Sequence, residues 1–406
     1  MLEQIVIVLS DKFATKRQYK TSLFKGDEEF KSSSVSKLIS RVKDTLILGA
    51  NKEELTIFEK VSEPKFFLNF GDISKSSRGL PFQKYIKTDS GIDSIAIYRG
   101  DHIARYSLKE SNEFISKNVL KNARDKVAFL SQPKVISQNI VAHVEYPTDH
   151  IILMATFDQQ GILTLDTVEN TVVTNKNFSL GFITSLLNSN FFSWYAYRFI
   201  FAKALRTMHL EDYHIGKLPI RRIFFTTSKT TRKKMVEKMK TMDENFKYNE
   251  VLNNVEECLP KDKKGNFITN KEKSDVVHDL LAYLAEHMIT MNKKKQMLSS
   301  KFLTWLESEI IKGSINDLKN KTKVREFYKD SFDELMSVLK QNRIFPKILD
   351  LGDRRYETLK KAYDSTMSKL KPLMNKLTAT DNLIDQIVYK LYGLTEDEIK
   401  VVEGSL

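Results

Sequence analysis

The residues in this sequence best suited to chemistry are basic, and they gather between residues 198 and 240. This stretch holds twelve lysines and arginines against three acidic residues, so its net charge is +9. Such side chains neutralise the phosphates of nucleic acids. A charge run can also be a solvated helical surface followed by a flexible linker. Because this run directly follows a β pattern and an aromatic helix, we favour phosphate binding.

Metal chemistry has weaker support. His209, Glu211, Asp212 and His214 form the one tight group of histidines and acids. They could hold zinc, but we favour a polar loop. Two segments have the spaced Asp…Glu-x-Lys form of nuclease metal sites: Asp44 with Glu63-Pro64-Lys65, and Asp11 with Glu29-Phe30-Lys31. Such matches arise by chance among 52 acids, so we predict no catalytic residue and no metal site.

The two motifs that an adenine methyltransferase uses to bind its cofactor and its target base are absent from the sequence. An adenine-N6 methyltransferase needs a glycine-rich turn for S-adenosylmethionine. It also needs an Asn/Asp-Pro-Pro-Tyr/Phe motif to hold the flipped adenine. The sequence has no Pro-Pro pair, and its 14 glycines form no G-x-G. We therefore predict that this chain binds no cofactor.

The composition is that of an ordinary globular protein. The 406 residues carry a net charge of +13 and are 41% hydrophobic, enough for two or three domains. No run of about 18 apolar residues is present, and the N-terminus lacks a signal-peptide pattern. The lone cysteine, Cys258, excludes an internal disulfide. We predict a cytoplasmic protein that does not bind membranes.

Four strands and a helix are predicted before the basic cluster or overlapping its start. Residues 5–9 predict a first strand, and residues 133–140, 151–157 and 162–167 predict three more. Ser179 can cap a helix over residues 180–201, whose aromatic side chains could stack on bases. On a helix this apolar, we predict that they are core. The stretch LPIRR at 218–222 ends the segment.

The C-terminal part has a helical pattern. Ser274 begins a helix with apolar residues at alternating spacings of four and three, as in a coiled-coil seam. The seam comprises Val277, Leu281, Leu284, Met288, Met291 and Leu298. We expect it to pack against later helices of the same chain. Further on, we expect Pro372 to end or kink a helix, Asp381 to cap the next one, Gly393 to stop it, and Thr395 and Glu398 to form a capping box.

The order of these segments resembles a known family. PKVISQNI (133–140), LLNS (186–189) and LPIRR (218–222) follow one another as in the TaqI-like specificity domain of restriction–modification enzymes. FGDI (70–73), SRG (77–79) and IYRGDHIARY (97–106) resemble earlier elements of that family. The helix at 274–298 and residues 380–404 resemble the closing part of type IIG restriction–methylation polypeptides.

The resemblance implies an α+β fold, with a mixed, β-rich target-recognition domain before a mainly helical C-terminal region. The predicted domains are residues 1–60 (the tail of a methyltransferase-type α/β domain), 61–225 (target recognition), 226–300 (basic linker and long amphipathic helix) and 301–406 (helical domain). The implied partners are double-stranded DNA and an adenine-N6 methyltransferase/endonuclease supplied elsewhere. S-adenosylmethionine and Mg²⁺ are implied for that missing catalytic part alone.

On this interpretation, two groups of residues contact DNA. The predicted phosphate contacts are Lys134, Arg198, Lys203, Arg206, Arg221 and Arg222. The predicted base contacts are Lys75, Arg78, Arg99, Arg105 and Gln138. Ordinary surface charge is the alternative for each of them.

Other functions remain open at this point. The chain could be a specificity subunit of a type I restriction or phage-defence methylase system, although it has no internal repeat. It could also be a non-catalytic remnant, or an enzyme with a metal site near Asp44 and Glu63.

Overall fold

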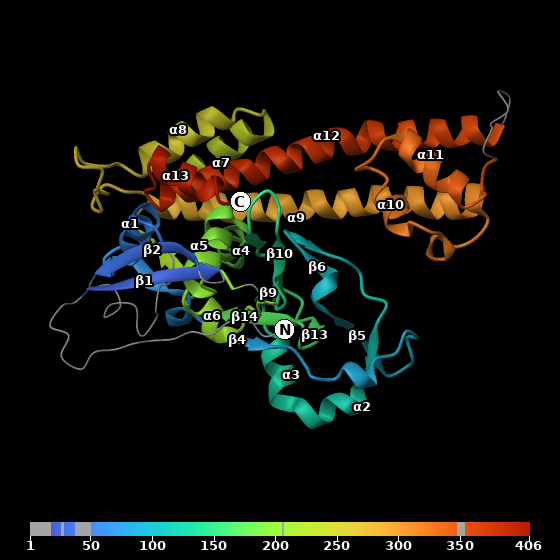
Figure 1. The fold of residues 1–406 in the computed structure, drawn as a ribbon, viewed down its shortest axis with the longest axis horizontal. Helices are drawn as coiled ribbons and strands as arrows, with labels where there is room; N and C mark the ends of the chain where they lie inside the picture. The colour runs from blue at the N-terminus through green and yellow to red at the C-terminus, as the bar shows by residue number, and fades with distance from the viewer. Residues whose placement is uncertain (1–17, 26–27, 37–49, 205–206, 347–353) are drawn as a thin grey trace.

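The structure, a computed structural model, describes residues 18–25, 28–36, 50–204, 207–346 and 354–406. Strands gather in the N-terminal half and long helices in the C-terminal half, as Figure 1 shows, so the predicted α+β class is confirmed. The first strands, β1 (Gln18–Lys25) and β2 (Glu28–Ser36), form a separate antiparallel pair. The strand predicted at residues 5–9 lies outside the described residues.

The central sheet has four antiparallel strands in the order β12 (Ala155–Asp158), β9 (Lys134–Gln138), β14 (Val168–Val173) and β4 (Ser74–Arg78). β9 is covered on both faces. Its Val135 belongs to the main core, whereas Ile136 packs with Ile103 and Val168 in a smaller cluster. β12 and β4 are the two edge strands, so one side of the β4 backbone has no strand neighbour within this sheet.

Smaller sheets surround this one. The strand predicted at 151–157 is two strands: β11 (His150–Ile152) pairs with β10 (Ala142–Val144), while β12 joins the central sheet. The predicted 162–167 strand shortens to β13 (Leu163–Thr164), which pairs with β5 (Ser94–Tyr98), itself paired with β8 (Phe114–Ser116). The remaining pairs are β3 (Phe67–Asn69) with β15 (Pro219–Arg221), and β6 (Ile103–Ala104) with β7 (Ser107–Leu108).

The aromatic helix predicted over 180–201 is interrupted. Ser179 caps α4 (Leu180–Asn188) as predicted, but Ser189 then starts α5 (Asn190–Tyr195) by accepting a hydrogen bond from the backbone of Phe192. A π-helix, Ala196–Ile200, follows. Phe191, Phe192 and Trp194 are buried, which confirms that these aromatic side chains belong to the core.

Two long helices dominate the C-terminal half. α9 (Ser274–Trp305) and α12 (Arg354–Leu391) lie side by side, as Figure 1 shows. The seam residues from Val277 to Met291 are buried against α4, α7 (Lys229–Glu244) and α12, so the predicted packing within the chain is confirmed. The domain boundary predicted at residue 300 falls inside α9.

One local prediction for α12 is wrong, because Asp381 lies inside the helix instead of capping a new one. The helix also continues through Pro372, so of the two predicted effects of this proline, the end of the helix is excluded. Leu370 is buried in the smaller core around Phe302 and Phe327, and Leu377 is buried in the main core. Packing on both sides of the proline therefore offsets the lost hydrogen bond. Farther on, Gly393 has a φ of 71° and ends the helix, and the Thr395–Glu398 capping box starts α13 (Glu396–Glu403), both as predicted.

The C-terminal end of α9 and the N-terminal end of α12 belong to a tip lobe with its own hydrophobic core, at the right of Figure 1. It contains α10 (Lys321–Arg325) and α11 (Phe332–Gln341). Phe302, Phe327 and Leu339 are buried in this core. The other helices are α1 (Lys52–Val61), α2 (Lys117–Leu120), α3 (Arg124–Leu130), α6 (Asp212–Ile215) and α8 (Tyr248–Cys258). Across the described ranges, no helix is both long and apolar enough to cross a membrane.

Gly79, which directly follows β4, allows the backbone there to lie close to the backbone of residues 164–165. An ideal Cβ on Gly79 would lie 2.2 Å from the carbonyl oxygen of Leu165 and 2.5 Å from that of Thr164. Gly79→Ala is therefore expected to lower the free energy of unfolding, measured with urea, by about 1–3 kcal/mol. Gly91→Ala is the control, because nothing lies within 4 Å of its added Cβ. Equal stabilities of the two variants would contradict this prediction.

Candidate nucleic-acid interface

Two of the predicted base-contacting residues lie on the edge strand β4, three positions apart, so their side chains leave from opposite faces of the sheet. Lys75 and Arg78 are both exposed. Lys75 pairs in register with Val172, and Arg78 with Glu169. The Arg78 Nε donates to the carbonyl of Asp166 at 3.0 Å, and its Nη1 lies 3.4 Å from the Glu211 carboxylate. These contacts orient the guanidinium while leaving 44% of the side chain exposed.

The short helix α6, which packs beside β4, adds an aromatic side chain to this surface. Tyr213 is 62% exposed. The Lys217 Nζ lies 3.9 Å from the centre of the Tyr213 ring and donates to its hydroxyl at 2.6 Å. Sequence reasoning did not single out Tyr213 because it treated 209–214 as a zinc site or a polar loop, and it counted Lys217 only within the basic cluster. The available signal was an aromatic residue four positions before a lysine.

The other three predicted base contacts are already engaged inside the protein. Arg99 contacts Glu113 at 2.7 Å through Nε. Arg105 contacts Asp381 of α12 at 2.6 Å and so ties the β-rich part to the long helix. The Gln138 side-chain nitrogen donates to the backbone carbonyls of Gly100 and Ile103 at 3.0 and 2.7 Å. These contacts stabilise the fold, while 32% of the Arg99 side chain and 23% of the Arg105 side chain remain exposed. The role of the three residues as base contacts stays a prediction.

Two predicted phosphate contacts are fully buried. The Lys134 Nζ lies 2.6 Å from Asp158 Oδ2 and 3.0 Å from the carbonyl of Ile162. Burial lowers the Lys134 pKa, while the hydrogen bond to Asp158 raises it. The Arg221 Nη2 lies 3.0 Å from Glu272 Oε2. Neither basic side chain has exposed surface, so neither can reach a phosphate.

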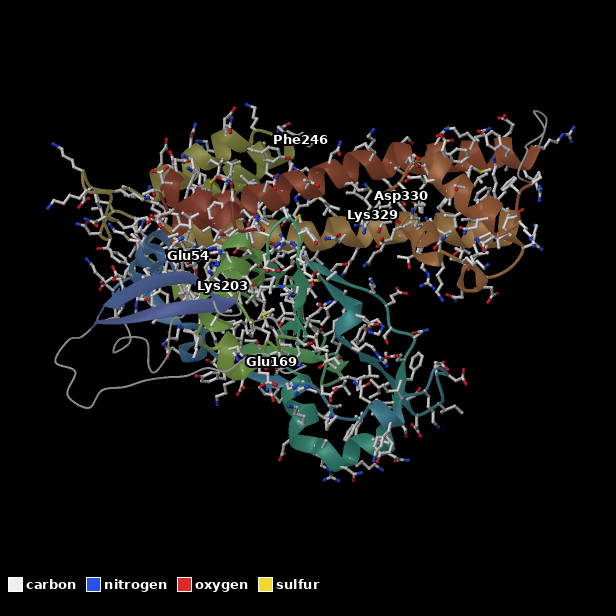
Figure 2. The ribbon with its side chains drawn as sticks, in the orientation of Figure 1. Glu54, Glu169, Lys203, Phe246, Lys329 and Asp330 are labelled. Carbon is white, nitrogen blue, oxygen red and sulfur yellow. The ribbon has the colours of Figure 1, made fainter. Side chains whose placement is uncertain are left out.

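Three of the remaining phosphate candidates lie near partners within the chain. Arg198 Nη2 is 3.3 Å, and Lys203 Nζ 4.0 Å, from the carboxylate of Glu54, which is 1% exposed. Figure 2 shows Glu54 and Lys203 next to each other. The Arg222 Nε donates to the carbonyl of Pro64 at 2.9 Å. Arg206 lies outside the described residues. The run of positive charge in the sequence is therefore partly neutralised by folding.

A buried carboxyl group lies on β14, directly beside the exposed edge. Glu169, labelled in Figure 2, has no exposed surface, and neither of its carboxyl oxygens has a hydrogen-bond partner. Burial, followed by the nearby charge of Asp212, raises its pKa to about 8. Lys126 and Arg78 act in the opposite direction. The carboxyl group is therefore largely neutral at pH 7, which no spacing in the sequence indicated.

The histidines near α6 have protein partners. His209 Nδ1 lies 2.8 Å from Asn139 Oδ1, and the His214 ring lies 5.1 Å from the ring of Phe201. Burial lowers the His214 pKa. Within the part of the chain that the structure describes, no group of three or more His, Cys, Asp or Glu residues could hold a metal ion. Glu63 is exposed, and Asp44 lies outside the described residues.

Comparison with known families identifies a segment that contains Tyr213 and Lys217 of this surface, but not Lys75 or Arg78. Residues 95–220 match the TaqI-like C-terminal specificity domain, and residues 269–388 match a domain of unknown function, DUF8810. No curated protein matches the chain. The first match contains three strands of the central sheet and α6, but not β4. Residues 95–220 are thus a TaqI-like specificity domain, to whose central sheet the preceding residues add the edge strand β4.

Proposed function

We propose that this chain reads DNA sequence for a type IIG restriction–modification enzyme and directs an adenine-N6 methyltransferase/endonuclease supplied elsewhere. The observation that carries the proposal is the TaqI-like specificity domain at residues 95–220, a domain type that supports a DNA-specificity function in restriction–modification. The chain lacks the methyltransferase motifs. S-adenosylmethionine and Mg²⁺ would therefore serve the catalytic part, not this chain.

The edge of the central sheet is the proposed reading surface. An arginine can bind the O6 and N7 atoms of guanine with two hydrogen bonds, which contributes about 1–3 kcal/mol of discrimination. Arg78 would first leave Glu211, but an exposed ion pair contributes only about 0–1 kcal/mol. Replacing the Arg78–Glu211 ion pair by the contact with guanine is therefore favourable at a matching base pair. Lys75, predicted as a base contact, leaves β4 from the face opposite to Arg78, so we assign it to the phosphates. Lys217 would also contact the phosphates, and Tyr213 would pack against the sugar or a base.

The proposal is tested by selection from a random duplex library. The purified chain, alone and with its catalytic partner, is incubated with the library, and the bound fraction is sequenced. An enriched motif is expected. If neither preparation enriches a motif, the chain does not read DNA sequence, and the remnant alternative holds.

Alanine substitutions on β4 should distinguish a base contact from a phosphate contact. Arg78→Ala is expected to weaken binding to the selected sequence about 10- to 100-fold and to relax one base position, because it removes a base contact. Lys75→Ala is expected to weaken binding to all sequences and to lower the slope of log K against log salt by about 1.

Lys400→Ala is the charge-matched control for both variants. Lys400 is exposed on α13, where it pairs with Asp397. Fluorescence anisotropy titrations at several salt concentrations measure all three variants. If Arg78→Ala resembles Lys400→Ala, Arg78 does not contact a base.

A further inference from the structure

Glu169 is a buried acid without a partner, in a fold that pairs buried charges elsewhere. Lys134 lies 2.6 Å from Asp158, and Arg221 lies 3.0 Å from Glu272. Glu169 has no exposed surface, and among the residues that the structure describes neither of its carboxyl oxygens has a hydrogen-bond partner. Glutamate is also under-represented in strands. Neither packing nor local structure therefore accounts for a glutamate at this position of β14.

The strand register places Arg78 directly beside this acid. Glu169 on β14 is paired with Arg78 on β4 and with the uncharged Ser137 on β9. Side chains of directly opposite residues leave an antiparallel sheet on the same face, with their Cβ atoms about 4.5–5.5 Å apart. Ser137 is buried too, and its hydroxyl has no hydrogen-bond partner within the described residues. Arg78 is thus the cation at the sheet edge of a row of buried polar side chains.

The other charges around Glu169 come from two helices. Asp212 of α6 and Glu211, the N-cap of α6, oppose the ionisation of its carboxyl group. Lys126 of α3 and Arg78 of β4 favour it. A carboxylate at this position therefore depends on the two cations for its stabilisation.

These two cations are held differently. The Lys126 ammonium group donates a hydrogen bond to the hydroxyl of Ser77, whose side chain leaves β4 from the face opposite to Arg78. The Arg78 guanidinium instead lies against Glu211 and the carbonyl of Asp166, and 44% of the side chain is exposed. Arg78 is therefore the cation that can leave the sheet for a ligand in solvent.

The charge of Glu169 determines how strongly Arg78 is held. A buried carboxylate that loses its neighbouring cation is costly, so ionised Glu169 attracts the guanidinium. A neutral carboxyl group exerts no such attraction. Burial raises the Glu169 pKa to about 8. The two forms therefore interchange within about one pH unit on either side of this value.

We infer that Glu169 is a positioning residue for Arg78: its neutral form leaves the guanidinium free to contact a base, and its ionised form retains the guanidinium at the sheet. The inference rests on the proposed function, in which Arg78 contacts guanine. Once Arg78 has left, the neutral form of Glu169 is favoured, so DNA binding takes up a proton. Affinity is therefore highest at the acidic end of the window and falls as pH rises.

The test is the pH dependence of binding to a duplex that carries the selected motif, measured by fluorescence anisotropy at constant salt and at pH 7, 8 and 9. The wild-type Kd is expected to rise about three- to tenfold across this range, since one proton changes a binding constant at most tenfold per pH unit. Glu169→Gln is expected to have the same Kd at all three pH values, because glutamine stays neutral. A purely structural role for Glu169 would change Kd by the same factor at each pH.

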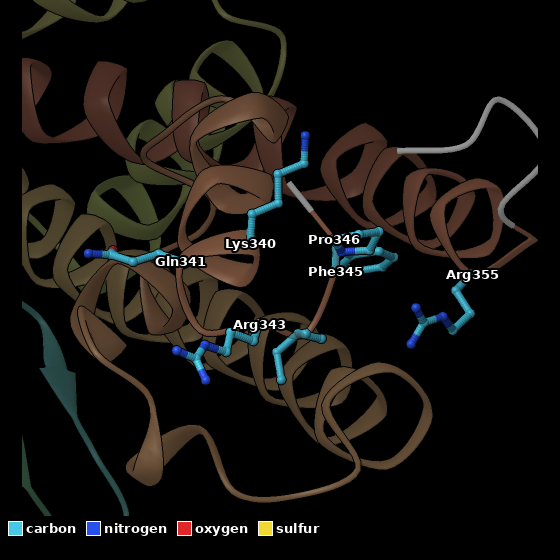
Figure 3. A pocket seen from close by; sticks show the side chains of 7 residues that line it. Lys340, Gln341, Arg343, Phe345, Pro346 and Arg355 are labelled. Carbon is cyan, nitrogen blue, oxygen red and sulfur yellow. The ribbon is translucent and has the colours of Figure 1, made fainter. Parts of the chain in front are cut away.

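Two arginine variants complete the test. Arg78→Ala is expected to bind weakly and without this pH dependence, because ionised Glu169 then has no guanidinium to retain. Arg343→Gly is the matched control. Figure 3 shows Arg343 at the end of α11 in the tip lobe, where its side chain is exposed and its φ of 61° suits glycine. This variant is expected to keep the pH dependence of the wild type.

Repeating the library selection at pH 7 and pH 9 tests the effect on the base itself. At pH 9 the wild type is expected to lose its preference at the base pair that Arg78→Ala relaxes, whereas Glu169→Gln is expected to retain it. The inference is overturned if the wild type and Glu169→Gln share one pH dependence, or if Arg78→Ala keeps that of the wild type. Either result, obtained with an enriched motif, removes the inference and leaves the proposed function standing. If no motif is enriched at either pH, the proposed function fails, and the inference fails with it.

Discussion

Glu272→Gln is expected to lower the free energy of unfolding by about 3–5 kcal/mol, because it leaves the Arg221 guanidinium charged and buried without a counter-ion. Both side chains have no exposed surface, and their closest N–O distance is 3.0 Å. The guanidinium also lies 4.9 Å from the Phe66 ring centre and 4.7 Å from that of Phe267. Burial lowers the Arg221 pKa. Urea unfolding followed by circular dichroism measures the loss.

Two control variants test whether the loss of stability comes from an unpaired buried charge. The double variant Arg221→Met, Glu272→Leu is expected to recover most of the stability, because it removes both charges together. Asp397→Asn breaks the ion pair with Lys400, whose side chains are 92% and 76% exposed respectively, and should change stability by less than about 1 kcal/mol. A loss in Glu272→Gln no larger than that in Asp397→Asn would refute the prediction.

Features that depend on a few neighbouring residues could be predicted from the sequence. The Ser179 cap, the Gly393 stop and the capping box at Thr395 each involve residues within one helical turn. The α9 seam also follows from spacing alone, because apolar residues at alternating intervals of three and four share one face of a helix. The buried aromatic side chains of α5 could be assigned to the core because the predicted helix around them is so apolar.

Which charged side chains are buried in ion pairs and which stay exposed could not be predicted from the sequence. Lys134, Arg198 and Arg221 have the same chemistry as exposed cations, and the sequence does not show that Asp158, Glu54 and Glu272 face them after folding. These partners come from other elements, so tertiary contacts alone bring the charges together. Lys75 and Arg78 remain exposed on the edge strand β4, whereas Ser74 of the same strand is buried, so exposure depends on which elements cover each face of the sheet, which is likewise a tertiary property.

Glu169 should make stability depend on pH in the direction opposite to that of a carboxylate in an ion pair. Its pKa in the folded protein is raised to about 8, from an ordinary value of 4.5. Between these values the folded protein keeps the proton and the unfolded chain loses it. Stability is therefore greatest at the acidic end of this window and falls as pH rises, by at most about 1.4 kcal/mol per pH unit. Asp385, whose pKa burial raises to about 7, acts in the same direction.

Glu169→Gln is expected to remove this part of the pH dependence, because glutamine stays neutral. At pH 8 the variant should be more stable than the wild type by roughly 3 kcal/mol, and the difference should shrink towards pH 5. Urea unfolding at half-unit pH steps measures both curves. Glu110→Gln, at an exposed position, is the control and should follow the wild type. Parallel curves for Glu169→Gln and the wild type would mean that Glu169 is ionised in the folded protein, and that Arg78 or Lys126 neutralises it beneath the reading edge.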